Sequence, residues 1–174
     1  DDISGRVRVA GVMALGTVGS DAAVAVLEKA LGIEDVDVQG QAVHSLARAG
    51  SGNARTVLRT NLKHQTPAVR RSAAQALGHM ADAPSLGALV SLVRDPIPDV
   101  RAAAVEAVGR LVDPKGVDAI RVGLTDRVPE VRARAAEAVG RMGDGKSLGA
   151  LASLARPEFS EAERIAAVTA IGFL

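Results

Sequence analysis

One phrase returns along this chain at an almost constant interval. Residues 100–109 read VRAAAVEAVG, residues 131–140 read VRARAAEAVG, and residues 69–78 read VRRSAAQALG. Weaker copies begin at Val7 and Val38, and a last copy occupies residues 163–172, one position later than the period requires. Because similarity at a fixed period, here about 31 residues, is the signature of repeat architectures, we predict a stack of similar units.

A second apolar ladder lies between these copies. Its first column, which follows the same period, is Leu27, Leu58, Leu89, Ile120 and Leu151. Its second column, one helical turn later, is Leu31, Leu62, Val93, Leu124 and Ala155. An i, i+4 spacing places both columns on one face of a helix. Each unit is therefore predicted to be two helices, in the third copy an outer helix from Ser85 to Arg94 and an inner helix from Pro98 to Leu111.

The predicted fold class is all-α, an α-solenoid of about five to six two-helix repeats, with six inner and five outer helices. Proline before the inner helices, as at Pro67 and Pro98, suits a helix start. Glycine recurs near the predicted inner-helix ends, at Gly16, Gly78, Gly109, Gly140 and Gly172. A helix-ending glycine and a glycine needed for close packing both explain that column.

In two repeats an Asp stands five residues before a Val-Arg pair, Asp95 before Val100-Arg101 and Asp126 before Val131-Arg132. These Asp-to-Val-Arg frames resemble the HEAT repeats, specifically the short units named after phycobilisome lyases. The resemblance covers about residues 3 to 174. It implies that an arginine at this position bonds an Asp between neighbouring repeats. The family includes chromophore lyases, regulatory domains, adaptors and a few enzymes, so the resemblance implies a fold more than a function.

Composition excludes several function classes. The net charge is +1, so no overall basic field would recruit nucleic acid or an acidic membrane. The chain has no cysteine, which excludes thiolate sites. It has no Trp or Tyr and only two Phe, so it offers few aromatic side chains on which nucleic-acid bases could stack. No apolar run approaches the roughly 18 residues of a membrane span. We expect residues 1–174 to form a single repeat domain that is a fragment of a longer protein. We also expect that protein to be cytoplasmic.

Two interpretations apply to the arginine that opens each inner helix, in the column Arg8, Arg70, Arg101, Arg132 and Arg164, where Gln39 is the exception. It is either a basic stripe for phosphates and acidic peptides or a structural ladder between repeats. Because each arginine stands near an acidic residue of a preceding turn, we favour the ladder. Its expected members are Arg70, Asp95, Arg101, Asp126 and Arg132.

A second polar column lies near the inner-helix ends, at Arg48, His79, Arg110 and Arg141, and is preceded one helical turn earlier by His44, Gln75, Glu106 and Glu137. Glu one turn before Arg is the better orientation of an i, i+4 pair, so the face is either solvated and self-paired or a recognition strip. Inner helices line the concave surface on which solenoids bind. The candidate partner-binding residues are Arg71, Gln75, His79, Glu106, Arg110, Arg134, Glu137 and Arg141.

No catalytic, metal or cofactor site is predicted. The chain has no Gly-x-Ser-x-Gly, no phosphate loop and no dinucleotide fingerprint. Its three histidines lack an evident carboxylate partner, and it has no His-Glu pair of the kind carried by iron hydroxylases built from such repeats. Nucleic acid is not expected as a partner.

The resulting hypothesis is a non-catalytic scaffold that binds a protein partner on its concave inner-helix face. The alternative is a subunit or domain of a HEAT-like enzyme, of the bilin-lyase or DNA-glycosylase type. The sequence leaves the identity of the partner and the oligomeric state open.

Overall fold

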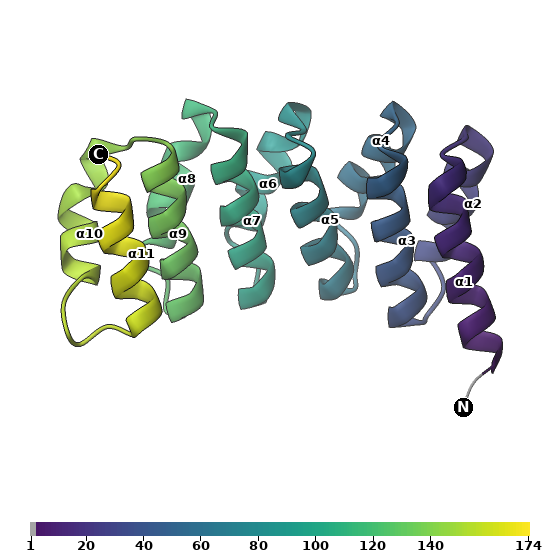
Figure 1. The fold of residues 1–174 in the computed structure, drawn as a ribbon, viewed down its shortest axis with the longest axis horizontal. Coiled ribbons are helices and arrows are strands. Elements are labelled where there is room, and N and C mark those ends of the chain that lie inside the picture. The colour runs from purple at the N-terminus through teal and green to yellow at the C-terminus, as the bar shows by residue number, and fades with distance from the viewer. Residues whose placement is uncertain (1–2) are drawn as a thin grey trace. The chain divides into compact units, whose positions relative to one another are not determined.

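The computed structural model describes residues 3–174, and every regular element within them is helical. Six helices occupy the predicted inner positions. They are α1 (Ile3–Val18), α3 (Val36–Ala49), α5 (Pro67–His79), α7 (Pro98–Leu111), α9 (Pro129–Arg141) and α11 (Glu161–Ile171). Five outer helices alternate with them (Figure 1). They are α2 (Asp21–Leu31), α4 (Gly52–Asn61), α6 (Leu86–Leu92), α8 (Val117–Gly123) and α10 (Leu148–Leu154). The predicted all-α series of two-helix repeats is confirmed for the described residues.

The predicted helix bounds are right for α7 and differ by about two residues at each end for the helical segment before it. Instead of one helix from Ser85 to Arg94, a 3-10 turn at Ala83–Ser85 leads into α6, which ends at Leu92. The same turn precedes α8 at Pro114–Gly116 and α10 at Gly145–Ser147. A 3-10 turn is a common and tighter way to begin an α-helix. It shortens the outer helices without disturbing their apolar face.

The helices gather into two compact units, one reaching to Met80 and the other covering Ala81–Leu174. In the first unit α3 packs between α1 and α5, and in the second unit α9 packs between α7 and α11. Each even-numbered helix lies against the odd-numbered helix that follows it. Within each unit the odd-numbered helices therefore form one directly packed layer, and the even-numbered helices form a second layer behind them.

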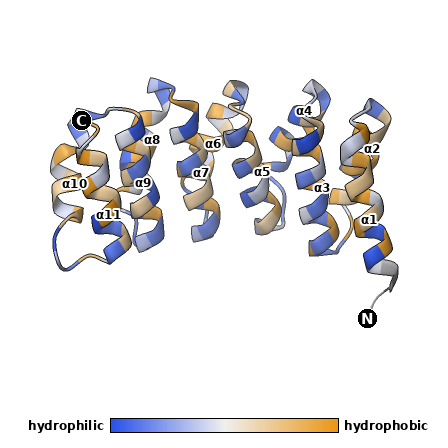
Figure 2. Cartoon of the chain, in the orientation of Figure 1, coloured by the Kyte–Doolittle hydropathy of each residue, from blue (hydrophilic) through white to orange (hydrophobic). Residues whose placement is uncertain are grey.

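The core of both units is the apolar ladder read from the sequence. The first column of that ladder, from Leu27 to Leu151, has no exposed surface at any of its positions. Val38, Val69, Val100 and Val131, which open the repeated phrase, are also buried. Each fully buried aliphatic side chain stabilises the fold by roughly 1.5–3 kcal/mol. Hydrophobic and hydrophilic residues accordingly alternate around the helices in Figure 2.

Glycine lets neighbouring odd-numbered helices approach closely. A Cβ built on Gly16 would lie 2.7 Å from the Ser45 Cβ, and one on Gly109 would lie 2.6 Å from the Ala138 Cβ. A Cβ on Gly140 would lie 2.8 Å from the Ala170 Cα. These glycines lie inside their helices, so close packing, and not helix termination, explains them. Gly172 differs, because it stands at the C-terminal end of α11.

A different column ends the odd-numbered helices, just beyond the glycines noted in the sequence. Gly19, Gly50 and Gly143 there have φ of 62°, 62° and 64°, in the left-handed region. Ala81 and Val112 occupy the same position with φ of 47° and 50°. Side chains with a Cβ rarely adopt this conformation, and a β-branched one least of all. The turn after each of these helices thus adopts the same left-handed conformation whether the residue there is glycine or not.

Candidate interaction face

The arginine that opens α7 is bonded entirely within the second unit. Arg101 is 6% exposed and donates from Nε and Nη2 to the two carboxylate oxygens of Asp126, at 2.7 and 2.9 Å. Its Nη1 donates to the carbonyl oxygens of Asp95 and Pro96. Asp126 belongs to the loop of the next repeat, so this guanidinium ties two repeats together. Each of its nitrogens is already engaged, which leaves it a poor ligand for a phosphate or an acidic peptide.

The next arginine keeps the role and changes the partner. Arg132 Nη1 donates to the Asp126 carbonyl oxygen at 2.6 Å, and its Nε donates to Glu163 Oε1 at 2.6 Å. Its guanidinium also lies 5.7 Å from the centre of the Phe159 ring, within the range of a cation–π contact. Glu163 is buried and belongs to the capping box of α11 with Ser160. The expected Asp is replaced here because Pro157 stands at its position.

The equivalent side chains of the first unit bind to neighbouring loops and helix ends. Arg8 lies 3.4 Å from an Asp35 carboxylate oxygen, and both side chains are partly exposed. Gln39 donates to the carbonyl oxygens of Leu31 and Ile33, and its own Oε1 has no hydrogen-bond partner among the described residues. Arg70 donates to the carbonyl oxygens of His64 and Gln65. Gln39 and Arg70, like Arg101 and Arg132, therefore bind carbonyl oxygens of the segment before their helix.

These links lower the pKa of the carboxyl groups in the second unit. Burial opposes the ionisation of Asp126 and Glu163, but hydrogen bonds to their carboxylates outweigh it and lower both pKa values below the usual range. Arg101 supplies the hydrogen bond to Asp126, and Ser160 and Arg132 supply those to Glu163. The pKa of Asp144 is lowered chiefly by its hydrogen bond from Arg121. Carboxyl groups that are already held as anions by arginine are poor candidates for general acids.

The exposed side of the odd-numbered helices in the second unit is largely self-paired. Arg110 lies 2.8 Å from Glu106, and Arg134 lies 3.0 Å from Glu130 and 3.5 Å from Glu137. Burial opposes ionisation of Glu106, yet its hydrogen bond from Arg110 lowers its pKa on balance. Glu137 and Arg141 are exposed. All the predicted residues of this unit lie on this side, and most of their charge is already compensated.

The exposed side of the first unit has a different character. Its predicted residues, Arg71, Gln75 and His79, are exposed on α5. His79 Nδ1 lies 2.7 Å from the carbonyl oxygen of Gln75, one turn earlier in the same helix. Gln75 and His79 border a hollow of about 560 Å³ between α3 and α5, which we call the α3/α5 hollow. Arg71 is not among the residues that line it.

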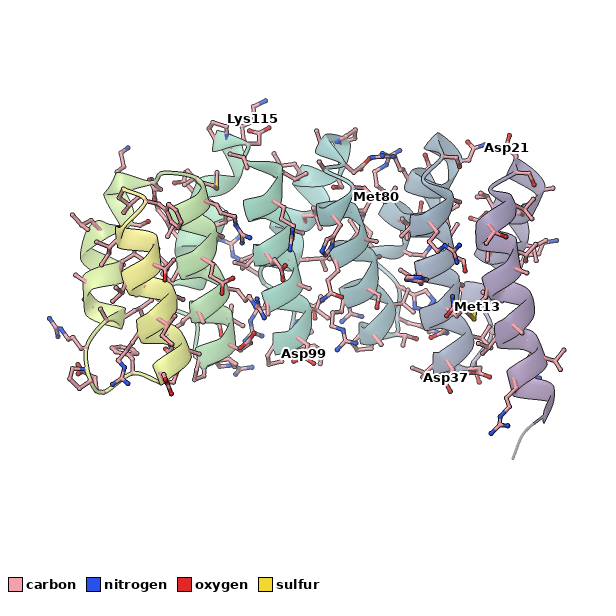
Figure 3. All side chains as sticks on the ribbon, in the orientation of Figure 1. Met13, Asp21, Asp37, Met80, Asp99 and Lys115 are labelled. Carbon is pink, nitrogen blue, oxygen red and sulfur yellow. The ribbon has the colours of Figure 1, made fainter. Side chains whose placement is uncertain are left out.

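The α3/α5 hollow is completed by residues that our candidate set omits. They are Gly40, Val43, His44, Ala47, Arg48, Ser72, Ala76 and Met80. His44 and Arg48 could have been found from the sequence, because they stand one repeat before Gln75 and His79. A second hollow of about 720 Å³, the α1/α3 hollow, lies beside it and shares Gly40 (Figure 3 labels Met13 of this hollow and Met80 of the first).

Other chemical sites are not evident in residues 3–174. The described residues include no cluster of three or more His, Asp or Glu side chains that could hold a metal ion. Across the same residues, no helix has the length and apolar character needed to cross a membrane. The Gly145-Lys146-Ser147 string, which echoes a phosphate loop, forms the 3-10 turn before α10, and Ser147 Oγ lies 2.5 Å from Asp144 Oδ2. It is a structural turn.

Comparison of the sequence with known protein families assigns it to one of them. The family of HEAT repeats matches the chain in four overlapping stretches, residues 1–78, 34–98, 56–121 and 86–172. The chain belongs to the HEAT-repeat family. The resemblance seen in the Asp-to-Val-Arg frames is thereby confirmed, and no curated protein matches the chain in sequence.

Solved structures agree on the fold. The complex of CpcE and CpcF of phycocyanin lyase from Nostoc sp. PCC7120 matches with a TM-score of 0.73 and 19% identity, over 87% of this chain and 99% of that one. A designed armadillo repeat protein in complex with the peptide (KR)4 matches with a TM-score of 0.66 and 20% identity, over 93% and 90%. An engineered protein matches with a TM-score of 0.68 and 20% identity, over 99% and 93%. These likenesses confirm the α-solenoid class.

Proposed function

We propose that this HEAT-repeat protein is a non-catalytic scaffold that binds a protein partner on the exposed side of its odd-numbered helices. The observation that carries the proposal is the position of the two hollows between α1, α3 and α5. Both are lined by odd-numbered helices and by residues directly before or after them. In solenoids, the side lined by the inner helices is the usual binding surface. A preformed face of this kind loses little entropy on binding.

The catalytic alternative has one observation in its favour, the likeness to the CpcE–CpcF complex of phycocyanin lyase. At 19% identity that likeness concerns the fold. The carboxyl groups with lowered pKa in this chain are bonded to arginine, and in the turn before α10 the Ser147 hydroxyl donates to Asp144, which itself accepts from Arg121. A DNA-glycosylase type would need a basic face with stacking aromatics, whereas the second-unit face pairs its charges. We therefore propose no enzymatic activity, cofactor or nucleic-acid partner.

Two further expectations belong to the same proposal. Residues 1–174 are proposed to act as one repeat domain, and the protein is proposed to work in the cytoplasm. Fluorescence microscopy of the tagged protein in its native cell tests the location. Labelling of the membrane fraction or the cell exterior would contradict it.

A matched pair of triple variants tests the scaffold. The face variant carries Arg48→Glu, Arg110→Glu and Arg141→Glu on odd-numbered helices. The control variant carries Arg59→Glu, Arg94→Glu and Lys115→Glu on or beside even-numbered helices, with the same change in net charge. Proteins captured from source lysate are identified by mass spectrometry, and bound pigment and nucleic acid are read by absorbance. We expect the face variant alone to lose protein partners. Retained proteins with loss of pigment or DNA would contradict the proposal.

A further inference from the structure

We propose that the α3/α5 hollow binds an acidic peptide segment in which carboxylate and apolar side chains alternate. The inference rests on the proposed scaffold function and names the site and the class of partner. It concerns the first unit alone. The contents of the hollow, the charges at its rim and the contrast with the second unit carry it.

The floor of the hollow is apolar and of useful size. It is made by Val43 and Ala47 of α3 with Ala76 of α5 and Met80, the residue that follows α5. A volume of about 560 Å³ lies within the range of pockets that hold ligands. Methionine at such a surface adapts to different apolar side chains, because it is flexible and polarisable. The floor therefore suits one or two aliphatic side chains of a bound segment.

The rim of the hollow carries one cation, the guanidinium of Arg48, without a compensating carboxylate. His44 and Arg48 stand one turn apart on α3, and His79 faces them from α5. Among the described residues that line the hollow there is no Asp or Glu. Arg48 is exposed and makes no ion pair with a carboxylate of the described residues. Its repeat equivalent Arg110, by contrast, already pairs with Glu106. Charge complementarity thus selects an acidic partner for the first unit.

The backbone geometry of the hollow suits an extended segment. Gly40 is shared with the α1/α3 hollow, and a Cβ built on it would meet nothing within 4 Å. The corresponding positions of other odd-numbered helices carry Val9, Arg71, Ala102 and Ala133. In an extended segment successive side chains point to opposite sides, so apolar side chains can sit on the floor while carboxylates reach the rim. Alternation in the partner follows from this geometry.

The probe is a fluorescein-labelled peptide (Glu-Leu)4 with blocked termini, and (Lys-Leu)4 is its charge-reversed control. The full chain is labelled with ¹³C at the methionine methyl groups. Its three methionines report separately, since Met80 lies in the α3/α5 hollow, Met13 in the α1/α3 hollow, and Met142 in the second unit. We expect (Glu-Leu)4 to shift the Met80 signal saturably below about 1 mM and to leave Met142 unchanged.

Two single variants of equal charge change sharpen the test. Arg48→Glu is expected to weaken (Glu-Leu)4 binding about tenfold, because it removes the rim cation and adds a repelling charge. Lys63→Glu, an exposed position in the same unit outside the hollow, should change binding less than about twofold. Arg48→Gln removes the charge without reversing it and should give an intermediate loss. Circular dichroism checks that each variant is folded.

Each outcome decides the inference. A saturable Met80 shift by (Glu-Leu)4 that needs about tenfold more peptide in the Arg48→Glu protein supports it. Equal binding of (Lys-Leu)4, a shift confined to Met142, or equal weakening by Lys63→Glu would overturn it while leaving the scaffold proposal standing. A single-stranded oligonucleotide that shifts Met80 where (Glu-Leu)4 does not would also overturn it. Failure of the scaffold itself would appear separately, as protein capture unaffected by the face variant.

Discussion

At the scale of single residues, the protein shows where a repeat tolerates an imperfect amino acid. The turn after an odd-numbered helix adopts positive φ, and glycine supplies it at Gly19, Gly50 and Gly143. Val112 adopts the same conformation with φ of 50° and is mostly exposed. We infer that the packing of the helices before and after the turn holds Val112 in this left-handed conformation, which is strained for a β-branched residue.

Replacing Val112 by glycine should therefore stabilise the protein. Relief of a left-handed β-branched residue is expected to raise the free energy of unfolding by about 1 kcal/mol. Chemical denaturation at neutral pH measures the change. The converse substitution, Gly143→Ala, has φ of 64° at the equivalent position and should lower the free energy of unfolding. A destabilised Val112→Gly protein would show that the turn is not strained.

At the scale of helices, packing in the odd-numbered layer depends on the absence of a single carbon atom. A Cβ on Gly109 would lie 2.6 Å from the Ala138 Cβ, closer than real contacts allow. The two helices would have to separate, and α7 and α9 share one of the most extensive helix–helix contacts of the second unit. The same substitution at Gly40 of α3 meets open space.

The pair Gly109→Ala and Gly40→Ala thus separates packing from helix propensity. Gly109→Ala should lower the free energy of unfolding by about 1–3 kcal/mol through overpacking. Gly40→Ala should raise it by about 0.5–1 kcal/mol, because alanine restricts the unfolded chain and favours the helix. Thermal and urea unfolding of the two variants measure the difference. Similar changes in both would refute the packing explanation.

At the scale of the whole molecule, stability depends on links from one repeat to the next. Arg101 with Asp126 and Arg132 with Glu163 each join two repeats of the second unit, at 2.7 and 2.6 Å. The pKa of both carboxyl groups is lowered in the folded protein, so their ionised forms favour the folded state. The stability they contribute is fully present above the pKa of the unfolded chain and is lost as pH falls through the folded pKa.

The free energy of unfolding should accordingly decline as pH falls below about 5. Asp126→Asn should be less stable than the parent at neutral pH, and its further loss on acidification should be smaller, because one titrating link is gone. Urea denaturation at a series of pH values measures both slopes. Parallel curves for the two proteins would mean that the Arg101–Asp126 pair does not couple folding to protonation.

Much of this protein follows from its sequence alone. The repeat period, the apolar columns and the proline positions determine two-helix repeats, because burial of a periodic apolar face admits few arrangements. The sequence also predicts the two frames, Asp95 with Arg101 and Asp126 with Arg132, and the resemblance implies that such an arginine bonds an Asp of a neighbouring repeat. Tertiary structure alone decided that Gly109 serves packing, that Glu163 replaces Asp as the partner of Arg132, and that the second-unit face is paired while the α3/α5 hollow is open. These depend on distances between residues of different repeats, which a period along the chain does not encode.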